Sequence, residues 1–368
     1  MKYILQVFTG IWQEKNCNPE DIIQKIGGIA SRLTVDKVII GWSTDASIYR
    51  KVGAFLHGLG IQMLLWLPVF SEISGISEPD EALDIFGNPP VAPFRQAGED
   101  FLFCCPSSRH NTQIVKDIYE TYFSCCGFDG VFLDKIRSQS FVSGVSGVLS
   151  CGCGRCRKAF AKKGVDIDEV GKLYEAKKDS FFDMASCPMN GEFELKDAMA
   201  QRFFEAKEEI IADAVAEICR YFKDRGMIVG LDLFAPFVSR LVGQSYPLLT
   251  RHADFIKPML YRKTEAPAGI GFEYALFEKH APAARGRRKI SMDDPSFLNA
   301  QLEAIQRAPC EKYPGIEINY REDIARTDAA YIAESLAAIK EYRFEGAALC
   351  WNVMLAPDAH IEAISDQE

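Results

Sequence analysis

The chain has 368 residues, 48% of them hydrophobic, so it can bury a sizeable core in one large domain or two small ones. Its net charge of −9 argues against nucleic acid or an anionic membrane as a partner, because either would need clustered positive charge. We interpret the basic run at residues 285–289 as a solvated loop. No stretch approaches the roughly 20 apolar residues of a membrane helix, and the amino-terminal apolar run is too short for a signal peptide. We therefore expect a cytoplasmic location.

Short apolar runs alternate with helix-patterned stretches along the whole chain. We count eight such runs, at residues 3–8, 37–42, 61–70, 130–133, 227–233, 255–261, 316–318 and 346–351. Repeated β–α units of this kind close into a (β/α)8 TIM barrel, and we predict one such domain over residues 1–368. The alternative is a doubly wound open sheet, which would need a glycine-rich phosphate loop that residues 8–12 do not provide.

Two connections between predicted strands are far longer than ordinary loops. One covers residues 71–105 after the third strand, and the other covers residues 138–190 after the fourth. Both follow the carboxyl ends of strands, where the loops of a barrel shape its substrate site. We therefore expect both at the mouth of the barrel, with an inserted loop subdomain at about residues 138–190.

The second long connection carries a cysteine cluster. Cys151, Cys153 and Cys156 place three thiols within six residues, with glycines between them. Tetrahedral zinc needs four ligands, with sulfur at about 2.3 Å, so a fourth thiolate must come from elsewhere. Cys105, which precedes a proline at the end of the other long connection, is our candidate, and Cys104 is the alternative. Four thiolates leave no open position for water, so we expect structural zinc and no organic cofactor; the alternative is reduced thiols, or a disulfide formed on oxidation.

The run GFDGVFLDKIR at residues 127–137 is a short apolar strand that ends in three charged groups. Because strand ends open into the shared pocket of a barrel, Asp134 is the first candidate for chemistry. The alternative is that Asp134 caps the following turn or pairs with Lys135 or Arg137. Carboxylates at strand ends can hydrolyse a glycosidic bond when one is protonated and another is ionised.

We predict that Asp134, after strand four, and Glu317, after strand seven, form this pair, with Asp232 in reserve. An aspartate followed by a lysine tends to stay ionised, which suits a nucleophile and would leave Asp232 or Glu317 as the acid; the roles stay open. The other candidates near strand ends are substrate-binding residues, and the tryptophans among them could stack on sugar rings. They are Trp12, Trp42, Trp66, Lys135, Arg137, Lys257, Tyr261, Tyr320, Trp351 and Asn352.

The cysteine spacing resembles the zinc cluster of the family 42 β-galactosidases, which are barrel glycosidases with a Cys-Pro after strand three and Cys-x-Cys-x-x-Cys after strand four. The match is carried by Cys105, Cys151, Cys153 and Cys156. In the clan of that family, an Asn-Glu after strand four supplies the acid/base and a Glu after strand seven is the nucleophile. Glu317 fits the nucleophile position, whereas strand four lacks the Asn-Glu. The resemblance implies a glycoside hydrolase with structural zinc and a carbohydrate substrate.

Two other functions stay open. Lys257 lies within strand six, where one class of aldolases and lyases places its Schiff-base lysine. The missing Asn-Glu also leaves room for a carbohydrate-binding barrel without turnover. The sequence does not indicate an oligomeric state.

Overall fold

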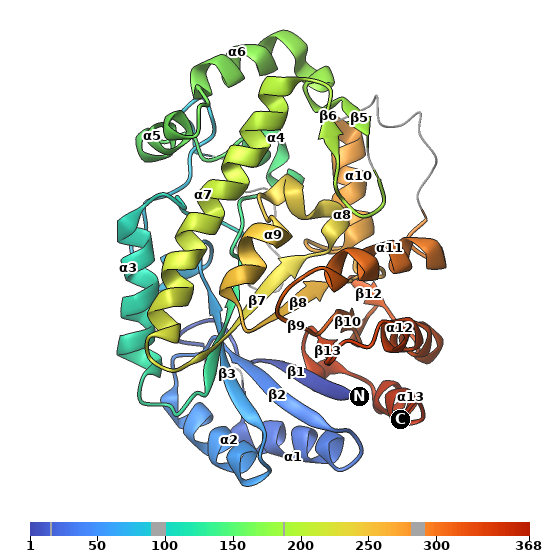
Figure 1. The fold of residues 1–368 in the computed structure, drawn as a ribbon. Coiled ribbons are helices and arrows are strands. Elements are labelled where there is room, and N and C mark those ends of the chain that lie inside the picture. The colour runs from blue at the N-terminus through green and yellow to red at the C-terminus, as the bar shows by residue number, and fades with distance from the viewer. Residues whose placement is uncertain (15–16, 90–100, 187, 281–290) are drawn as a thin grey trace.

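A computed structural model describes residues 1–14, 17–89, 101–186, 188–280 and 291–368 of the chain (Figure 1). The solvated loop predicted at residues 285–289, and part of the first long connection, lie outside the described residues. Among the helices within the described ranges, none has the length and apolar character to span a membrane.

Eight parallel strands form a closed barrel. In order around it they are β1 (Lys2–Phe8), β2 (Val35–Gly41), β3 (Gln62–Pro68), β4 (Gly130–Asp134), β7 (Ile228–Phe234), β8 (Phe255–Met259), β10 (Gly315–Glu317) and β13 (Gly346–Cys350). β13 pairs with β1, and a bridge between Met259 and Gly315 joins β8 to β10, so the sheet closes on itself. The short β9 (Glu311–Lys312) pairs with the start of β8. The expected (β/α)8 fold is confirmed, and every predicted strand overlaps an observed one.

The barrel strands are buried on both faces. All five residues of β4 and all five of β13 are buried, and six of the seven residues of β7 are as well. One face of each strand fills the barrel interior and the other packs against helices, which is why these segments read as nearly continuous apolar runs rather than alternating ones. Because the strands are buried, a charged side chain at a strand end is unusual and marks a candidate functional residue.

Most of the surrounding helices begin at a capping side chain that accepts a backbone N–H of the first turn. They are α1 (Pro19–Ala30) after Asn18, α2 (Ala46–Gly58) after Asp45, α3 (Arg109–Ile118) after Ser108, α7 (Ala198–Lys223) after Asp197, α11 (Pro295–Gln306) after Asp294 and α12 (Ala329–Glu341) after Asp328. Further helices follow the later strands: α8 (Pro236–Ser239), α9 (Tyr246–Leu249), α10 (Ile270–His280) and α13 (Asp358–Ser365). A small hairpin of β11 (Tyr320–Arg321) and β12 (Ala325–Arg326) follows β10.

The chain between β4 and β7 builds an additional set of elements. These are α4 (Gly144–Val148), α5 (Gly154–Lys162), α6 (Ile167–Lys177) and a hairpin of β5 (Met184–Ser186) and β6 (Glu194–Leu195). Figure 1 shows them gathered at one end of the molecule, with α7 running from there back along the barrel. They share a hydrophobic cluster that includes Phe160, Phe182 and Phe203. The subdomain expected at about residues 138–190 falls within this stretch.

Candidate active site

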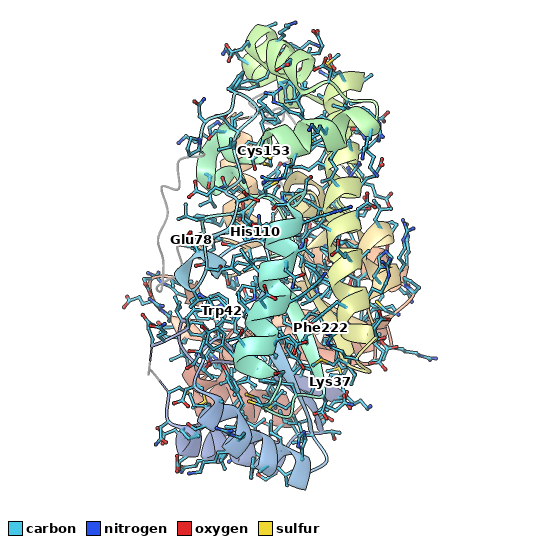
Figure 2. The ribbon with its side chains drawn as sticks, turned by 90° about the vertical axis from the view of Figure 1, so that its left-hand side faces the viewer. Lys37, Trp42, Glu78, His110, Cys153 and Phe222 are labelled. Atoms are coloured by element: carbon cyan, nitrogen blue, oxygen red, sulfur yellow. The ribbon has the colours of Figure 1, made fainter. Side chains whose placement is uncertain are left out.

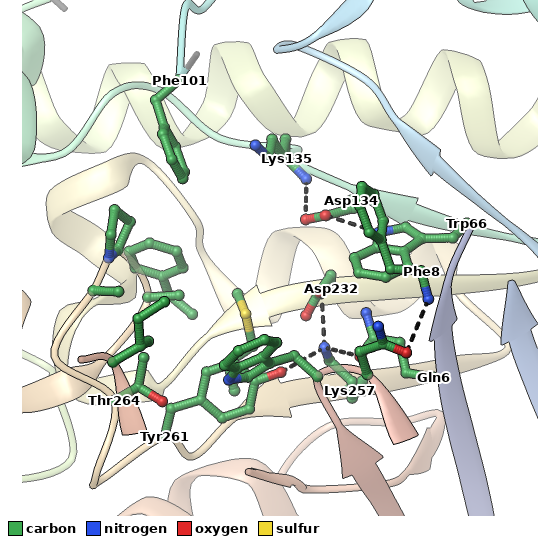
Figure 3. A pocket seen from close by; sticks show the side chains of 18 of the residues that line it. Gln6, Phe8, Trp66, Phe101, Asp134, Lys135, Asp232, Lys257, Tyr261 and Thr264 are labelled. Carbon is green, nitrogen blue, oxygen red and sulfur yellow. Dashed lines mark hydrogen bonds and ion pairs between the residues drawn. The ribbon is translucent and has the colours of Figure 1, made fainter. Parts of the chain in front are cut away.

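A cavity of about 250 Å³ lies at the carboxyl ends of the barrel strands (Figure 3). Its polar lining includes Gln6 from β1, Asp134 from β4, Asp232 from β7 and Lys257 from β8. Aromatic rings form much of the remaining wall, from Phe8, Trp66, Phe101, Phe234, Tyr261 and Trp351. An apolar pocket with a few convergent polar groups is the usual form of a small-molecule site.

Asp134 is held by hydrogen bonds to both of its carboxylate oxygens. The indole N–H of Trp66, on the neighbouring strand, donates to Oδ2 at 2.9 Å. The backbone N–H of Lys135 donates to Oδ1 at 2.5 Å. The side chain is only 8% exposed and lines the cavity. These two donors fix the orientation of the carboxylate at the cavity wall.

Asp232 lies beside Asp134 in the sheet. Leu133 of β4 pairs with Leu231 of β7, so the aspartates that follow them occupy the same level of adjacent strands. Oδ2 of Asp232 lies 2.9 Å from Nζ of Lys257, whereas its Oδ1 is buried without a hydrogen-bond partner among the described residues. The two carboxylates therefore share one cavity, and one of their oxygens has unused hydrogen-bonding capacity.

Burial controls the charge of Asp232 and Lys257. Desolvation raises the pKa of Asp232 to about 7, and the charge of Asp134 adds to this effect, although Lys257 opposes it. Burial acts to lower the pKa of Lys257, but Asp232 outweighs it and the net pKa is raised. Lys257 also donates hydrogen bonds to the Tyr261 hydroxyl at 3.0 Å and to Oε1 of Gln6 at 3.2 Å. Lys257 is therefore a protonated ammonium with three oxygen partners.

Two of the four tryptophans predicted at the site line the cavity, namely Trp66 and Trp351. Trp42 is fully buried and packs behind the wall, with its ring centroid 5.5 Å from that of Trp66 and 6.4 Å from that of Trp12. Trp12 donates its indole N–H to the backbone carbonyl of Glu72 at 2.7 Å. The prediction that Trp12 and Trp42 contact substrate is therefore corrected, because both side chains are occupied by packing.

Of the predicted cationic and remaining polar residues, some line the cavity and others do not. Lys135, Arg137 and Asn352 line the cavity. The Arg137 guanidinium lies between two rings, 4.6 Å from the centroid of Phe103 and 4.5 Å from that of Phe234. Tyr320 is 51% exposed on the β11–β12 hairpin and is not part of the cavity lining.

Glu317 differs most from expectation. It is fully buried and does not line the cavity. Its Oε1 accepts the backbone N–H of Lys263 at 2.5 Å and the Thr264 hydroxyl at 3.4 Å, and its Oε2 accepts the hydroxyl of Tyr331 at 2.6 Å. Because Tyr331 belongs to α12, this side chain points toward the helical layer. The structure therefore brings Asp134 together with Asp232 rather than with Glu317.

Several residues of the site were missed by the sequence reasoning, notably Gln6, Glu72 and Phe101. Glu72 is buried and forms an ion pair with Lys135, with 2.9 Å between Oε1 and Nζ. It belongs to a long irregular connection in which no hydrophobic period distinguishes inward from outward positions, so only its position shortly after β3 could have indicated it. Gln6 lies inside β1, and the available signal was a single polar residue within an otherwise apolar run.

The four predicted cysteines come together at the insertion. The sulfur atoms of Cys105, Cys151, Cys153 and Cys156 all lie within 4.8 Å of one another. Cys104 is not part of the group, because its side chain is buried in the barrel core. Figure 2 shows Cys153 on the insertion side of the molecule, with Trp42 nearer the barrel. The predicted fourth member is therefore Cys105 and not its neighbour.

No protein-family model matches the chain, and no curated protein matches its sequence. Among solved structures, the chain is similar to the PgaB (BpsB) glycoside hydrolase domain from Bordetella bronchiseptica, with 14% identity, a TM-score of 0.63 and coverage of 99% of this chain and 98% of that one. The likeness is one of fold. A second similar structure is alpha-L-fucosidase isoenzyme 2 from Paenibacillus thiaminolyticus, with 12% identity, a TM-score of 0.58 and coverage of 100% of this chain and 48% of that one.

A class V chitinase from Pseudomonas fluorescens Pf-5 is a third similar structure, with 9% identity, a TM-score of 0.52 and 99% coverage of both chains. At such identities the shared feature is the barrel, and residue roles do not transfer. The resemblance to the family 42 zinc site rests on the four cysteines alone.

Proposed function

We propose that this protein is a glycoside hydrolase whose working carboxylates are Asp134 and Asp232. The observation that carries the proposal is their placement at one level of two adjacent strands, in a cavity walled by aromatic rings. Glycoside hydrolysis needs two carboxyl groups in different protonation states at one sugar-sized site. This pair replaces the one expected from sequence, because Glu317 is engaged by α12 and by backbone outside the cavity.

The environments of the two carboxyl groups assign their roles. Burial raises the pKa of Asp232 to about 7, so this group can carry a proton near neutral pH and act as the general acid. Asp134, oriented by Trp66 and by the Lys135 amide, acts as the nucleophile or base. Trp66 and Trp351 offer ring faces to the C–H faces of a sugar.

The raised pKa of Lys257 argues against the aldolase alternative. A Schiff-base lysine must lose its proton to attack a carbonyl, and the ion pair with Asp232 raises the pKa of Lys257 instead. Borohydride trapping with keto compounds provides the check, and a stable adduct at Lys257 would favour the aldolase. The carbohydrate-binding alternative differs from our proposal only in lacking turnover, so activity measurements separate the two.

The test is hydrolysis of a panel of aryl glycosides by the intact chain. We expect Asp134→Asn and Asp232→Asn, which preserve side-chain shape, each to lower kcat by about 10²- to 10⁴-fold. Glu317→Gln is the matched control, because it changes a buried carboxyl outside the cavity, and it should keep most of the activity. Full activity in both asparagine variants would overturn the proposal. Loss of activity in Asp134→Asn and Glu317→Gln, with Asp232→Asn still active, would restore the pair first expected.

We also infer that Cys105, Cys151, Cys153 and Cys156 hold structural zinc. A tetrahedral site with zinc–sulfur bonds of about 2.3 Å needs sulfur atoms roughly 3.8 Å apart. The sulfur of Cys105 lies 3.3 Å from that of Cys153 and 3.4 Å from that of Cys156, so a small adjustment fits the ion. Zinc here would join the two long connections. Because thiolates need a reducing compartment, this inference agrees with the expected cytoplasmic location, which stays a prediction.

A further inference from the structure

Four residues with left-handed backbone meet at one side of the cavity. Seven non-glycine residues of the described chain have such φ angles, and four of the seven belong to this single group. They are Trp12 at 42°, Glu72 at 65°, Phe101 at 50° and Lys135 at 53°. Left-handed backbone is unfavourable for side chains other than glycine, and folded proteins concentrate it at functional sites. The four residues come from three different loops, so local sequence does not explain the grouping.

Glu72 connects the other three. Its backbone carbonyl accepts the indole N–H of Trp12 at 2.7 Å. Its Oε1 accepts the backbone N–H of Phe101 at 3.1 Å, the hydroxyl of Ser71 at 2.9 Å and the ammonium of Lys135 at 2.9 Å. Both side chains of the Glu72–Lys135 ion pair are nearly inaccessible to solvent, at 4% and 6% exposure. Each member of the group is thus fixed through this one carboxylate and its backbone.

Lys135 transmits this arrangement to Asp134. Its ammonium lies over the rings of Phe101 and Trp42, with 4.3 Å and 5.3 Å to their centroids, while Glu72 holds it from the side. The backbone N–H of Lys135 donates to Oδ1 of Asp134 at 2.5 Å, and the left-handed φ of Lys135 sets how this peptide plane is oriented relative to the Lys135 side chain (Figure 3). Because Glu72 holds the Lys135 side chain, the peptide plane that carries this N–H is held with it.

We propose that Glu72 is a positioning residue that orients the Asp134 carboxylate through Lys135. The inference deepens the proposed function and rests on it only in treating Asp134 as a working group. Glu72 itself does not line the cavity, whereas Lys135 and Phe101 do. The unfavourable backbone of the group persists because the buried ion pair and the hydrogen bonds to Glu72 stabilise it, as expected for a preorganised site.

The backbone part of the inference is tested by two substitutions at one position. Lys135→Gly and Lys135→Ala both remove the ion pair, so their difference reports only on the backbone. Because glycine accepts left-handed φ, Lys135→Gly should be at least as stable toward urea as Lys135→Ala. At Lys158, an exposed position within α5, the usual order should hold, with alanine favoured by about fivefold in the unfolding equilibrium constant. The same order at both positions would overturn this part.

The coupling to Asp134 has a readout that needs no ligand. The chain contains four tryptophans, so its indole N–H groups give four assignable nuclear magnetic resonance signals. Trp66 donates its indole N–H to Asp134, so its signal reports on the orientation of that carboxylate. Glu72→Gln should shift the Trp66 signal. Glu208→Gln breaks a comparable buried pair with Arg240, 2.7 Å apart and outside the cavity, and should leave the signal unchanged. An unmoved Trp66 signal in Glu72→Gln would refute the coupling.

Activity then separates this inference from the proposed function. In an active enzyme, Glu72→Gln should lower kcat by about 10- to 100-fold with little change in KM, because a displaced carboxylate reacts poorly once substrate is bound. Glu208→Gln should retain wild-type kcat. If the wild type hydrolyses glycosides and Glu72→Gln matches it, the positioning role fails while the proposed function stands. If the wild type hydrolyses nothing and the Trp66 signal still shifts, the proposed function fails while the coupling stands.

Discussion

Glu317 is a buried acid whose charge the fold disfavours. Desolvation raises its pKa to about 7, although the hydrogen bonds from Tyr331 and from the Lys263 amide oppose the rise. In the unfolded chain the same group would ionise near its ordinary pKa of 4.5. Because the folded-state pKa is the higher one, the contribution of this group to stability is complete below pH of about 4.5 and is lost as the pH rises through about 7.

Replacing Glu317 by glutamine should remove that loss. Glutamine keeps the shape and can accept the Lys263 amide, but it stays neutral at every pH. We expect the stability of Glu317→Gln relative to wild type to rise between pH 5 and pH 8, by up to about 3 kcal/mol. Urea unfolding at several pH values measures this, and the exposed Glu322→Gln serves as the control. If the free energy of unfolding depends on pH in the same way for wild type and Glu317→Gln, the carboxyl is already ionised in the folded protein.

Glu317 also shows the limit of what the sequence can predict about a single side chain. Asp134 is the last residue of β4 and Asp232 lies two residues before the end of β7; each follows an apolar run, and both reach the cavity. β10 has only three residues, too few for an alternating pattern to tell which side chains face the barrel interior. Position after a strand was therefore sufficient to nominate Glu317 but not to assign its direction. Glu72 had no such pattern at all.

At the scale of elements, the backbones of the two long connections contact each other near the cysteines. The N–H of Gly152, in the second connection, donates to the carbonyl of Leu83 in the first at 2.8 Å. Within the first connection, the N–H of Cys105 donates to the carbonyl of Asp80 at 2.8 Å. A Cβ atom at Gly152 would lie 2.4 Å from the carbonyl oxygen of Asp84, so only glycine allows this approach. The sequence predicted the convergence from thiol spacing. It could not predict these contacts, because they depend on an irregular loop conformation.

A matched pair of variants tests the metal inference. Cys105→Ala should abolish zinc binding, whereas Cys104→Ala, one residue away in the barrel core, should retain one zinc per chain. The physical reason is that three thiolates cannot complete a closed tetrahedral site. Metal content measured by plasma mass spectrometry on purified protein gives the answer. Zinc retained by Cys105→Ala, or lost from Cys104→Ala with the fold intact, would contradict the assignment.

The barrel as a whole was the most predictable level of the structure. Apart from the three-residue β10, its strands are buried apolar runs of ordinary length, and alternation with helical patterns over the whole chain leaves few topologies that could fit. The short elements of the insertion, such as β5 and β6, were not anticipated, because elements of two or three residues carry no period. The junction that closes the barrel depends on one glycine, Gly346.

Gly346 opens β13 at the point where the last barrel strand meets the first, opposite Lys2 of β1. A Cβ atom there would lie 2.1 Å from the carbonyl oxygen of Lys2, and backbone on a paired strand cannot move aside easily. We expect Gly346→Ala to lower the free energy of unfolding by about 1–3 kcal/mol. Gly28→Ala is the control, since that glycine lies within α1 with nothing within 4 Å of its would-be Cβ, and alanine there should stabilise by about 0.5–1 kcal/mol. Urea denaturation of both variants measures the contrast. Equal stability of Gly346→Ala and wild type would mean that a Cβ atom fits at the junction of β1 and β13, contrary to these distances.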